Sequence, residues 1–349
     1  MIKVLIIKTS SMGDIAHTFP AIYELKKNIK NIEIDWVVEE SFVDVVKLNK
    51  HVNNIITVNT RRWRKNWFRN IGNVFKFIKK LRAKKYDYVI DAQGLHKSLI
   101  ITRLSKVNNK NKFGYDKNSI RGKYISWLYY NQISVSKEQH AIYRIQELFG
   151  KVFDYKFIKK ESPDYGIESE KFINKKTIMF ISNTTWETKK WPINNWIELG
   201  KLFSKNNYKI IINSGNDFEY KDACNIKEHL LNITNVEILK NESLDEKIEI
   251  IKKCDYVFSV DTGLAHVSAL LGKNTIAIYG ATSPKLTGIK GKNCTILYAK
   301  YNCSPCLKKK CRFENNVNYK ICYSNSADLI KNINLAFVNT SIANKSNST

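Results

Sequence analysis

The chain has 349 residues, 43% of them hydrophobic, so it is long enough for two packed domains and too apolar for a disordered chain. Its 58 Lys and Arg against 32 Asp and Glu leave a formal net charge of +26, which indicates a polyanionic partner, either nucleic acid or an anionic lipid surface. A compositional bias toward Lys, Asn and Ile is the competing explanation of the bulk excess, but it does not explain local clusters of Arg.

No apolar run approaches the roughly 18–20 residues of a membrane-spanning helix. The apolar start over 1–7 is short and soon meets polar residues, so it fits a buried strand better than a signal peptide. We therefore expect a cytosolic protein.

The first half of the chain alternates between expected strands and helices. They are a strand over 4–7, a helix over 15–29, a strand over 34–38, helices over 42–48 and 74–81, a strand over 88–90 and a helix from Lys97. Repeated strand–helix units predict a parallel sheet with right-handed crossovers, here an N-terminal Rossmann-like domain over 1–165.

Between 152 and 176 the alternation gives way to charged and turn residues, and it then restarts in a second domain expected over 172–325. Its expected strands cover 177–182, 209–213, 236–239, 256–260 and 275–279, and its expected helices cover 191–204, 218–231, 244–252 and 264–271. A terminal helix is expected over 326–338 and a disordered polar tail over 339–349. The fold class is therefore α/β with two doubly wound sheets, in which ligands bind beyond the carboxyl ends of the strands.

The segment 259–266 is the best-placed motif of the second half. A buried strand runs into Asp261-Thr262-Gly263 and a helix begins at once, so free amides and the helix dipole form a site for phosphate. His266 lies in the first helical turn. A strand–turn–helix with an Asp or Thr cap and a buried histidine is the alternative, and the spacing alone favours neither.

Asp14 follows the first expected strand, at the start of the first helix. The segment lacks the three glycines of a dinucleotide-binding fingerprint, and no P-loop is present, so nicotinamide and ATP chemistry lose support. Taken alone, Asp14 is most simply an N-cap, but a carboxylate at this edge of a sheet could also serve as a general base.

Two further strand ends of the second half carry polar side chains. Thr184, Thr185 and Lys189 follow a strand and precede a helix, where hydroxyls and a lysine would suit a pyrophosphate leaving group. Glu219 follows the next strand, where an acidic residue could bind ribose hydroxyls.

The densest basic and aromatic cluster spans 61–69, with five cations among nine residues. Arginine pairs with phosphate or carboxylate in a bidentate fork, and aromatic side chains stack on ligands or sit at a membrane surface. Anion binding is therefore favoured over a solvated helix face with buried tryptophan. The cluster does not identify the anion.

The seven cysteines form an odd set without a signal peptide, which argues against a secreted disulfide framework. Cys303 and Cys306 have CxxC spacing and Cys311 and Cys322 follow, so four thiolates could hold a structural zinc ion. The wide last gap and the lack of a second CxxC favour reduced structural thiols or a redox-labile pair.

Five stretches, at 8–14, 35–40, 61–65, 91–95 and 259–266, together resemble glycosyltransferase family 9, inverting enzymes with two Rossmann-like domains facing across a cleft (GT-B). Arg-Arg-Trp-Arg-Lys and Ser-Ser-Met-Gly-Asp favour the lipopolysaccharide heptosyltransferase I group over heptosyltransferase II. The resemblance implies ADP-L-glycero-β-D-manno-heptose as donor and the first Kdo of Kdo2-lipid A as acceptor, joined in an α-1,5 linkage with inversion.

The same resemblance implies roles for single residues. Asp14 takes the position of the general base, and Lys189 that of the cation that neutralises the leaving diphosphate. The other donor-binding positions are Gly13, Thr184, Thr185, Glu219 (at the ribose), Asp261, Thr262, Gly263, Leu264 and His266. The acceptor-binding positions are Arg61, Arg62, Arg64, Lys65 and Arg121. No metal or other cofactor is required.

We further expect a monomer without a nucleic-acid partner, peripheral on the cytoplasmic face of the inner membrane. The remaining cations would hold it near an anionic leaflet, each surface Lys or Arg being worth about 1 kcal/mol before screening. A sister transferase, heptosyltransferase II or one with another nucleotide-sugar donor, is the alternative. A non-catalytic polyanion-binding protein is the competitor from another class, although no helix-turn-helix or RNA-binding signature is present.

Overall fold

The computed structural model describes residues 1–122, 126–129, 131–168, 175–299, 301–313, 321–323, 330–331 and 333. The chain divides into two compact units, Met1–Ile167 and Glu168–Thr349, and the division falls inside the stretch where the strand–helix alternation lapses. The predicted terminal helix over 326–338 lies outside the described residues except for 330, 331 and 333, and the predicted tail over 339–349 lies wholly outside them.

The first unit is built on a six-stranded parallel sheet in the order β3-β2-β1-β4-β5-β6. Its strands are β1 (Ile2–Ile7), β2 (Ile32–Glu39), β3 (Asn54–Val58), β4 (Tyr88–Asp91), β5 (Lys112–Tyr115) and β6 (Asn131–Ile133). Strand β1 pairs with β2 on one side and β4 on the other, so the winding of the sheet reverses between β1 and β4. The carboxyl ends of these two strands are where a doubly wound sheet binds its ligand.

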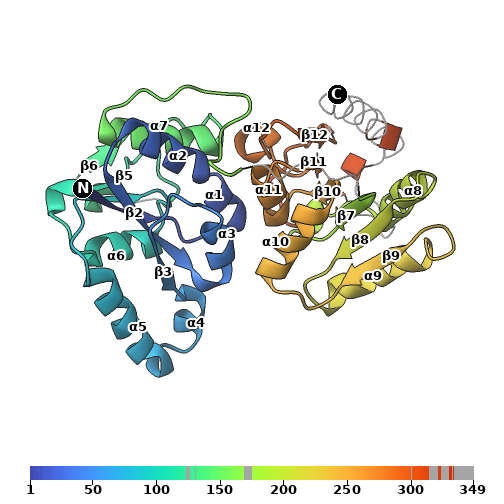
Figure 1. Ribbon diagram of the computed structural model, residues 1–349, viewed down its shortest axis with the longest axis horizontal. Helices are drawn as coiled ribbons and strands as arrows, with labels where there is room; N and C mark the ends of the chain where they lie inside the picture. Colours follow the sequence, from blue (N-terminus) through green and yellow to red (C-terminus); the bar gives the residue numbers. More distant parts are fainter. Residues whose placement is uncertain are drawn as a thin grey trace. The chain divides into compact units, whose positions relative to one another are not determined.

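Helices cover both faces of this sheet. They are α1 (Met12–Ala16), α2 (Phe19–Asn28), α3 (Val43–Lys47), α4 (Thr60–Lys65), α5 (Trp67–Arg82), α6 (His96–Leu104) and α7 (Ala141–Phe153). Helices α5 and α6 lie on one face, and α2 and α7 on the other (Figure 1). Phe77 and Leu81 of α5 are buried against Leu5 and Ile7 of β1, which ties α5 to the sheet core.

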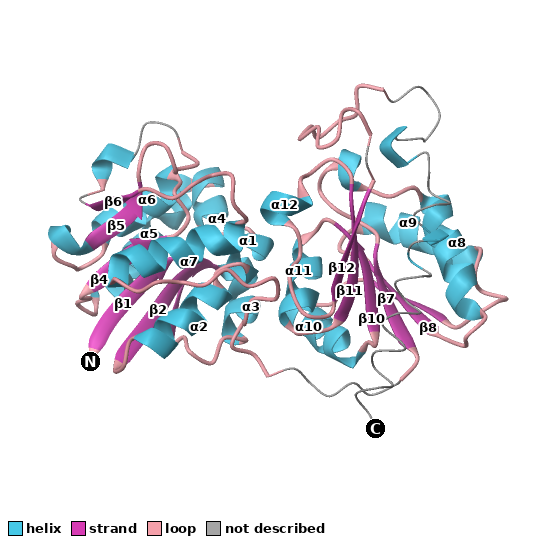
Figure 2. Ribbon diagram, turned by 90° about the horizontal axis from the view of Figure 1, so that it is seen from above, coloured by secondary structure: helices cyan, strands magenta, loops and turns pink. Residues whose placement is uncertain are grey.

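The second unit repeats this arrangement, with strand order β12-β11-β10-β7-β8-β9. Its strands are β7 (Thr177–Ile181), β8 (Lys209–Asn213), β9 (Val236–Leu239), β10 (Tyr256–Val260), β11 (Asn274–Tyr279) and β12 (Cys294–Tyr298). Its helices are α8 (Ile193–Ser204), α9 (Asp217–Glu228), α10 (Leu244–Lys253), α11 (Gly263–Leu270) and α12 (Pro284–Thr287). Helices α8 and α9 cover one face and α10 and α11 the other (Figure 2), and the winding reverses between β7 and β10.

The prediction of two doubly wound α/β sheets is confirmed. The single helix predicted over 15–29 is wrong: α1 ends at Ala16 and α2 begins at Phe19 with Pro20 in its first turn, where a proline needs no intrahelical N–H. The sequence pattern also misses β3, β5, β6, β12, α4 and α7. Strands β6 and β12 are short or only half-buried, so they carry little alternation between apolar and polar residues. None of the helices in the described ranges combines the length and apolarity needed to cross a bilayer.

Candidate active site

Asp14 lies beyond the carboxyl end of β1, in the first turn of α1. Its Oδ2 atom accepts hydrogen bonds from the backbone N–H and the hydroxyl of Ser11, at 3.1 and 3.0 Å. The N-cap of α1 is Ser11, and Asp14 is the third helical residue, which accepts the N–H of the N-cap as in a capping box; the interpretation of Asp14 as the N-cap itself is therefore wrong. Lys8 Nζ lies 3.7 Å and Arg121 Nη1 lies 3.3 Å from Oδ1, and a cap alone does not need these cations.

The charges around Asp14 fix its ionisation. Burial alone would raise the pKa of the Asp14 carboxyl, but the cations of Lys8 and Arg121 hold this pKa well below its usual range. Burial also lowers the pKa of Lys8 to about 8, against the opposing effect of the Asp14 charge. Asp14 is therefore an ionised carboxylate at neutral pH, as a general base must be.

The segment after β4 holds Lys8 in place. Lys8 Nζ donates to the carbonyl of Ala92 at 2.9 Å. Gln93 Oε1 accepts hydrogen bonds from the backbone N–H groups of Thr9 and Ser10, both at 3.1 Å. The sequence stretches 8–14 and 91–95 therefore meet at the point where the winding of the sheet reverses.

A third cation, Arg144 of α7, completes the surroundings of Asp14. Its guanidinium lies over the ring of Tyr115, 5.3 Å from the ring centroid, and donates to the carbonyl of Ser119 at 2.5 Å. Arg144, Tyr115, Lys8 and Asp14 line one small hollow. Three cations around one carboxylate leave this site net positive, which suits an acidic sugar.

The two acidic residues at the end of β2 position α4. Glu39 accepts hydrogen bonds from the backbone N–H and hydroxyl of Thr60, and Lys97 Nζ lies 3.3 Å from its Oε1. Asn59 caps α4 through Arg62 N at 3.2 Å and donates to Glu40 at 2.6 Å. The exposed cations presented by this helix are Arg61, Arg62, Arg64 and Lys65.

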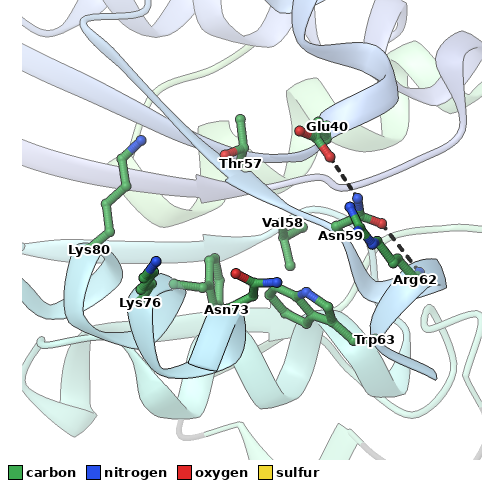
Figure 3. A pocket seen from close by; sticks show the side chains of 10 residues that line it. Glu40, Thr57, Val58, Asn59, Arg62, Trp63, Asn73, Lys76 and Lys80 are labelled. Carbon is green, nitrogen blue, oxygen red and sulfur yellow. Dashed lines mark hydrogen bonds between the residues drawn. The ribbon is translucent and has the colours of Figure 1, made fainter. Parts of the chain in front are cut away.

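A cavity of about 300 Å³ lies between the end of β3 and helices α4 and α5 (Figure 3). Arg62 and Trp63 of α4 and Lys76 and Lys80 of α5 line it, with Asn73 between them. The cavity joins an indole ring to three cations and the Glu40 carboxylate, so its lining is net positive.

Replacing Lys8 by methionine is expected to move the acid limb of the activity–pH profile upward. Lys8 is the strongest of the charges that lower the pKa of Asp14, and burial, which raises it, would remain. An adjacent cation typically lowers a carboxyl pKa by about 1–3 units, so the limb should shift by at least about one unit. The measurement is a 13C NMR titration of the Asp14 carboxyl from pH 2 to 7, beside the initial transfer rate over the acidic range in which the enzyme stays folded, with Lys47→Met as the exposed control. Identical profiles would show that Lys8 does not set the ionisation of Asp14.

In the second unit, the strand ends of β7 and β10 meet through Lys189 and Asp261. Lys189 Nζ lies 2.7 Å from Asp261 Oδ2 and 4.8 Å from the ring centroid of Trp186. Thr184 donates to the Asp261 carbonyl at 3.4 Å, and Thr282 donates to its carboxylate at 2.6 Å. Thr184 and Asp261, 77 positions apart in the chain, are thus brought together where this sheet reverses its winding.

The backbone after Asp261 forms the start of α11, with Thr262 as the N-cap and Gly263 as the first helical residue. The Thr262 side chain makes no capping hydrogen bond, so its hydroxyl is available to a ligand. His266 is buried in the first turn, its Nε2 3.9 Å from Asp261 Oδ1, and Leu264 is buried beside it. The helix start offers free N–H groups next to the Lys189 amine, which suits a diphosphate.

The remaining predicted donor residues of this unit are Thr185 and Glu219, whereas Gly13 lies in α1 of the first unit, next to Asp14. Thr185 is exposed in the loop of Thr184. Glu219 lies in the first turn of α9, after β8, and its Oε2 accepts the N–H of Gly215 at 2.7 Å. Since β8 is the neighbour of β7, this carboxylate lies at the same edge of the sheet as Lys189. Its contact with a ribose stays a prediction.

All seven cysteines are free thiols. In the described ranges, no group of three or more His, Cys, Asp or Glu side chains is arranged to hold a metal ion. Burial, together with the neighbouring Cys311 and Cys303, raises the pKa of Cys322 to about 11. A bound zinc ion would deprotonate the thiols that it contacts, so the raised pKa of Cys322 does not test the zinc alternative for Cys303, Cys306, Cys311 and Cys322, which stays a prediction.

Comparison with known proteins places this geometry in a family. Residues 74–317 match glycosyltransferase family 9 (heptosyltransferase). Lipopolysaccharide heptosyltransferase 1 of Pseudomonas aeruginosa is 34% identical over 318 residues, covering 89% of this chain and 88% of that protein. This chain belongs to glycosyltransferase family 9. It is a glycosyltransferase, and its predicted family is confirmed.

Two solved structures of a heptosyltransferase are also similar to this chain. The E. coli heptosyltransferase WaaC with ADP has a TM-score of 0.78 and 36% identity, covering 86% of this chain and 94% of that one. The same enzyme with ADP-2-deoxy-2-fluoro heptose has a TM-score of 0.75 and 36% identity, covering 84% and 92%.

Sequence patterns alone do not identify Lys8, Gln93 and Arg144 as site residues of this family 9 enzyme. Lys8 and Gln93 lie inside the stretches that carry the family resemblance, so their position after a buried strand is a usable signal. Arg144 lies within α7 and carries no such signal, because only the packing of that helix brings it to Asp14.

Proposed function

We propose that this chain is a lipopolysaccharide heptosyltransferase I. It transfers L-glycero-D-manno-heptose from ADP-heptose to the first Kdo of Kdo2-lipid A, forming an α-1,5 linkage with inversion. The observation that carries the proposal is the pair of strand-end clusters. One holds an ionised carboxylate among three cations, and the other holds Lys189 beside a free helix start.

The donor half of the proposal rests on the second unit. The Lys189 amine and the amides of α11 would bind the diphosphate, and Asp261 holds the lysine in position at 2.7 Å. The relative solved with ADP and with a fluorinated ADP-heptose shares 36% of its sequence with this chain, which supports an ADP-heptose donor. A heptosyltransferase 1 at 34% identity supports the same reaction.

The acceptor half rests on the first unit. Lys8, Arg121 and Arg144 would bind the carboxylate of Kdo, while Asp14 accepts the proton of the attacking hydroxyl. The exposed cations of α4 and the cavity that Arg62 lines would bind the other acidic groups of the acceptor.

In the reaction, the acceptor oxygen attacks the anomeric carbon from the face opposite the leaving group. The bond from that carbon to the diphosphate oxygen breaks, and ADP leaves with the electron pair. The acceptor proton passes to Asp14. Negative charge grows on the diphosphate as the bond breaks, and Lys189 and the α11 amides stabilise that charge.

The proposed reaction requires no metal, because Lys189 and the helix start supply the positive charge that a divalent cation would otherwise provide. Treatment with EDTA followed by dialysis is expected to leave the rate of ADP release within about twofold of the untreated rate. Loss of activity that Mg²⁺ or Zn²⁺ restores would contradict this.

The proposal also states that the enzyme is monomeric, that it lies in the cytoplasm at the surface of the inner membrane, and that it has no nucleic-acid partner.

The deciding experiment is a transfer assay with purified chain, ADP-heptose and Kdo2-lipid A. ADP release and a mass gain of one heptose on the acceptor are the expected results. No gain with this acceptor, together with a gain on an already heptosylated one, would assign the chain to heptosyltransferase II chemistry. No turnover with any nucleotide-sugar would overturn the proposal.

A further inference from the structure

Helix α5 carries large apolar side chains on two opposite faces. Phe77 and Leu81 face the sheet and are buried in the core of the first unit. Phe68, Ile71 and Phe75 are 89%, 47% and 66% exposed. Their spacing of three and four residues places them on one side of the helix. A helix packed on a sheet needs one apolar face, so folding of the unit does not account for the second.

The stripe of Phe68, Ile71 and Phe75 is open to solvent along its length. A side chain added at Gly72, in the middle of the stripe, would meet no atom within 4 Å. Figure 1 shows α4 and α5 side by side at the lower end of the first unit, with their junction at its tip. The stripe is thus an open surface rather than the wall of a groove.

The charges of α4 and α5 all have one sign. From Thr60 to Arg82 the chain contains nine Lys and Arg and no Asp or Glu. Arg64, Arg69 and Lys76 are exposed, and in the described part of the chain no carboxylate forms an ion pair with them. Phe68 and Phe75 therefore lie among cations that only an external anion can neutralise.

We propose that α4 and α5 dock the enzyme on an anionic lipid surface, with Phe68, Ile71 and Phe75 inserted among the lipid chains. The inference rests on the proposed function, whose acceptor is a membrane lipid. An anionic leaflet matches both features, because acyl chains take the apolar stripe and lipid phosphates take the flanking cations. RNA would match the cations but would leave the stripe exposed.

Docking through α5 would also bring the headgroup of the lipid acceptor close to the cavity beside α4. Lys76 and Lys80 lie between the stripe and the sheet-facing side of α5 and line the cavity that Arg62 and Trp63 also line (Figure 3). A lipid held in the leaflet would present its anionic sugars next to this cavity. Helix α5 would thus insert into the membrane and also provide lysine side chains that bind the headgroup.

The first test is co-sedimentation of the full chain with vesicles, in the absence of donor and acceptor. The wild type is expected to bind phosphatidylethanolamine–phosphatidylglycerol vesicles and to bind phosphatidylcholine vesicles much more weakly. The double variant Phe68→Ser/Phe75→Ser should lose about tenfold or more of its affinity for the anionic vesicles. Phe218→Ser is the matched control, because Phe218 is 81% exposed on α9 of the second unit, and it should bind as the wild type does.

Equal binding of the double variant and the wild type to anionic vesicles would overturn the proposal. So would binding to poly(U) RNA that falls in the double variant while vesicle binding does not. A second assay separates this inference from the proposed function. Transfer to a water-soluble, deacylated acceptor should be unchanged in the double variant, whereas transfer to acceptor embedded in vesicles should fall. If neither the wild type nor the double variant transfers heptose to the soluble acceptor, the proposed function fails, but the vesicle-binding result still tests the docking surface.

Discussion

Substitution of Asp14 by asparagine is expected to lower the rate constant for heptosyl transfer about a thousandfold, within the range of about 10²–10⁴ that general base catalysis contributes. Asparagine keeps the shape of the side chain and an oxygen that can accept the two bonds from Ser11. It cannot take the proton of the acceptor hydroxyl. ADP release and acceptor mass measure the loss, and binding of ADP should be unchanged because the residues proposed to bind the diphosphate lie in the second unit.

The control for this variant is Asp44→Asn in α3, since Asp44 forms a surface pair with Lys47 at 2.9 Å. Thermal unfolding of both variants separates chemistry from folding. In Asp14→Asn the Lys8 amine stays buried without its nearest counter-charge, so some loss of stability is expected. An Asp14→Asn enzyme that retains more than about a tenth of the wild-type rate would remove Asp14 from the role of base.

The low pKa of Asp14 has a consequence for the order of events. A carboxylate held among Lys8, Arg121 and Arg144 is a weak base toward an alcohol. An acceptor carboxylate bound to the same cations would neutralise part of their charge and raise the pKa of Asp14. Binding of the acceptor would thus make Asp14 a stronger base. Because the acceptor hydroxyl becomes more acidic as its oxygen bonds to the anomeric carbon, proton transfer to Asp14 would follow cleavage of the bond to ADP.

The sequence predicts the central strands of both sheets well. Strands such as Tyr256–Val260 are buried along their whole length, and they therefore read as unbroken apolar runs. The edge strand Asn131–Ile133 has no fully buried residue and gives no such pattern. Edges of a sheet are set by pairing with a neighbour, which a single stretch of sequence does not record.

The same difference applies to the site. Lys189 and Asp261 follow β7 and β10, which are neighbouring strands where the sheet reverses its winding. The strand order therefore predicts that the two side chains lie close together, and the structure places Lys189 Nζ 2.7 Å from Asp261 Oδ2. The contact of Arg144 with the Asp14 hollow depends on the packing of α7, and no local pattern predicts it. Lys8 lies inside one of the stretches that carry the family resemblance. Because lysine is rarely buried in proteins, its residue type alone would not predict its buried position in the site.

Substitution of Lys189 by methionine is expected to lower the transfer rate constant by about 10²–10³, the usual effect of removing one group that stabilises charge in a transition state. Methionine retains much of the side-chain length and its packing against Trp186, and loses only the charge. Since the amine faces a diphosphate whose charge grows during bond cleavage, the rate constant should fall more than ADP affinity. Lys190→Met is the matched control, because that neighbouring amine points to Asp222 at 3.5 Å.

In Lys189→Met the Asp261 carboxylate loses its ion-pair partner, so a loss of stability could be mistaken for a loss of catalysis. It is buried, and removing its cation leaves a buried charge beside Thr282 and His266 without the lysine, which costs stability of up to about 3–5 kcal/mol. The double variant Lys189→Met/Asp261→Asn removes both charges and should recover much of the unfolding temperature while staying inactive. Stability and catalysis would then be separated in one pair of proteins. A double variant that regained both stability and transfer would show that Lys189 serves only to pair with Asp261, and the developing charge on ADP would have to be met by the amides of α11 alone.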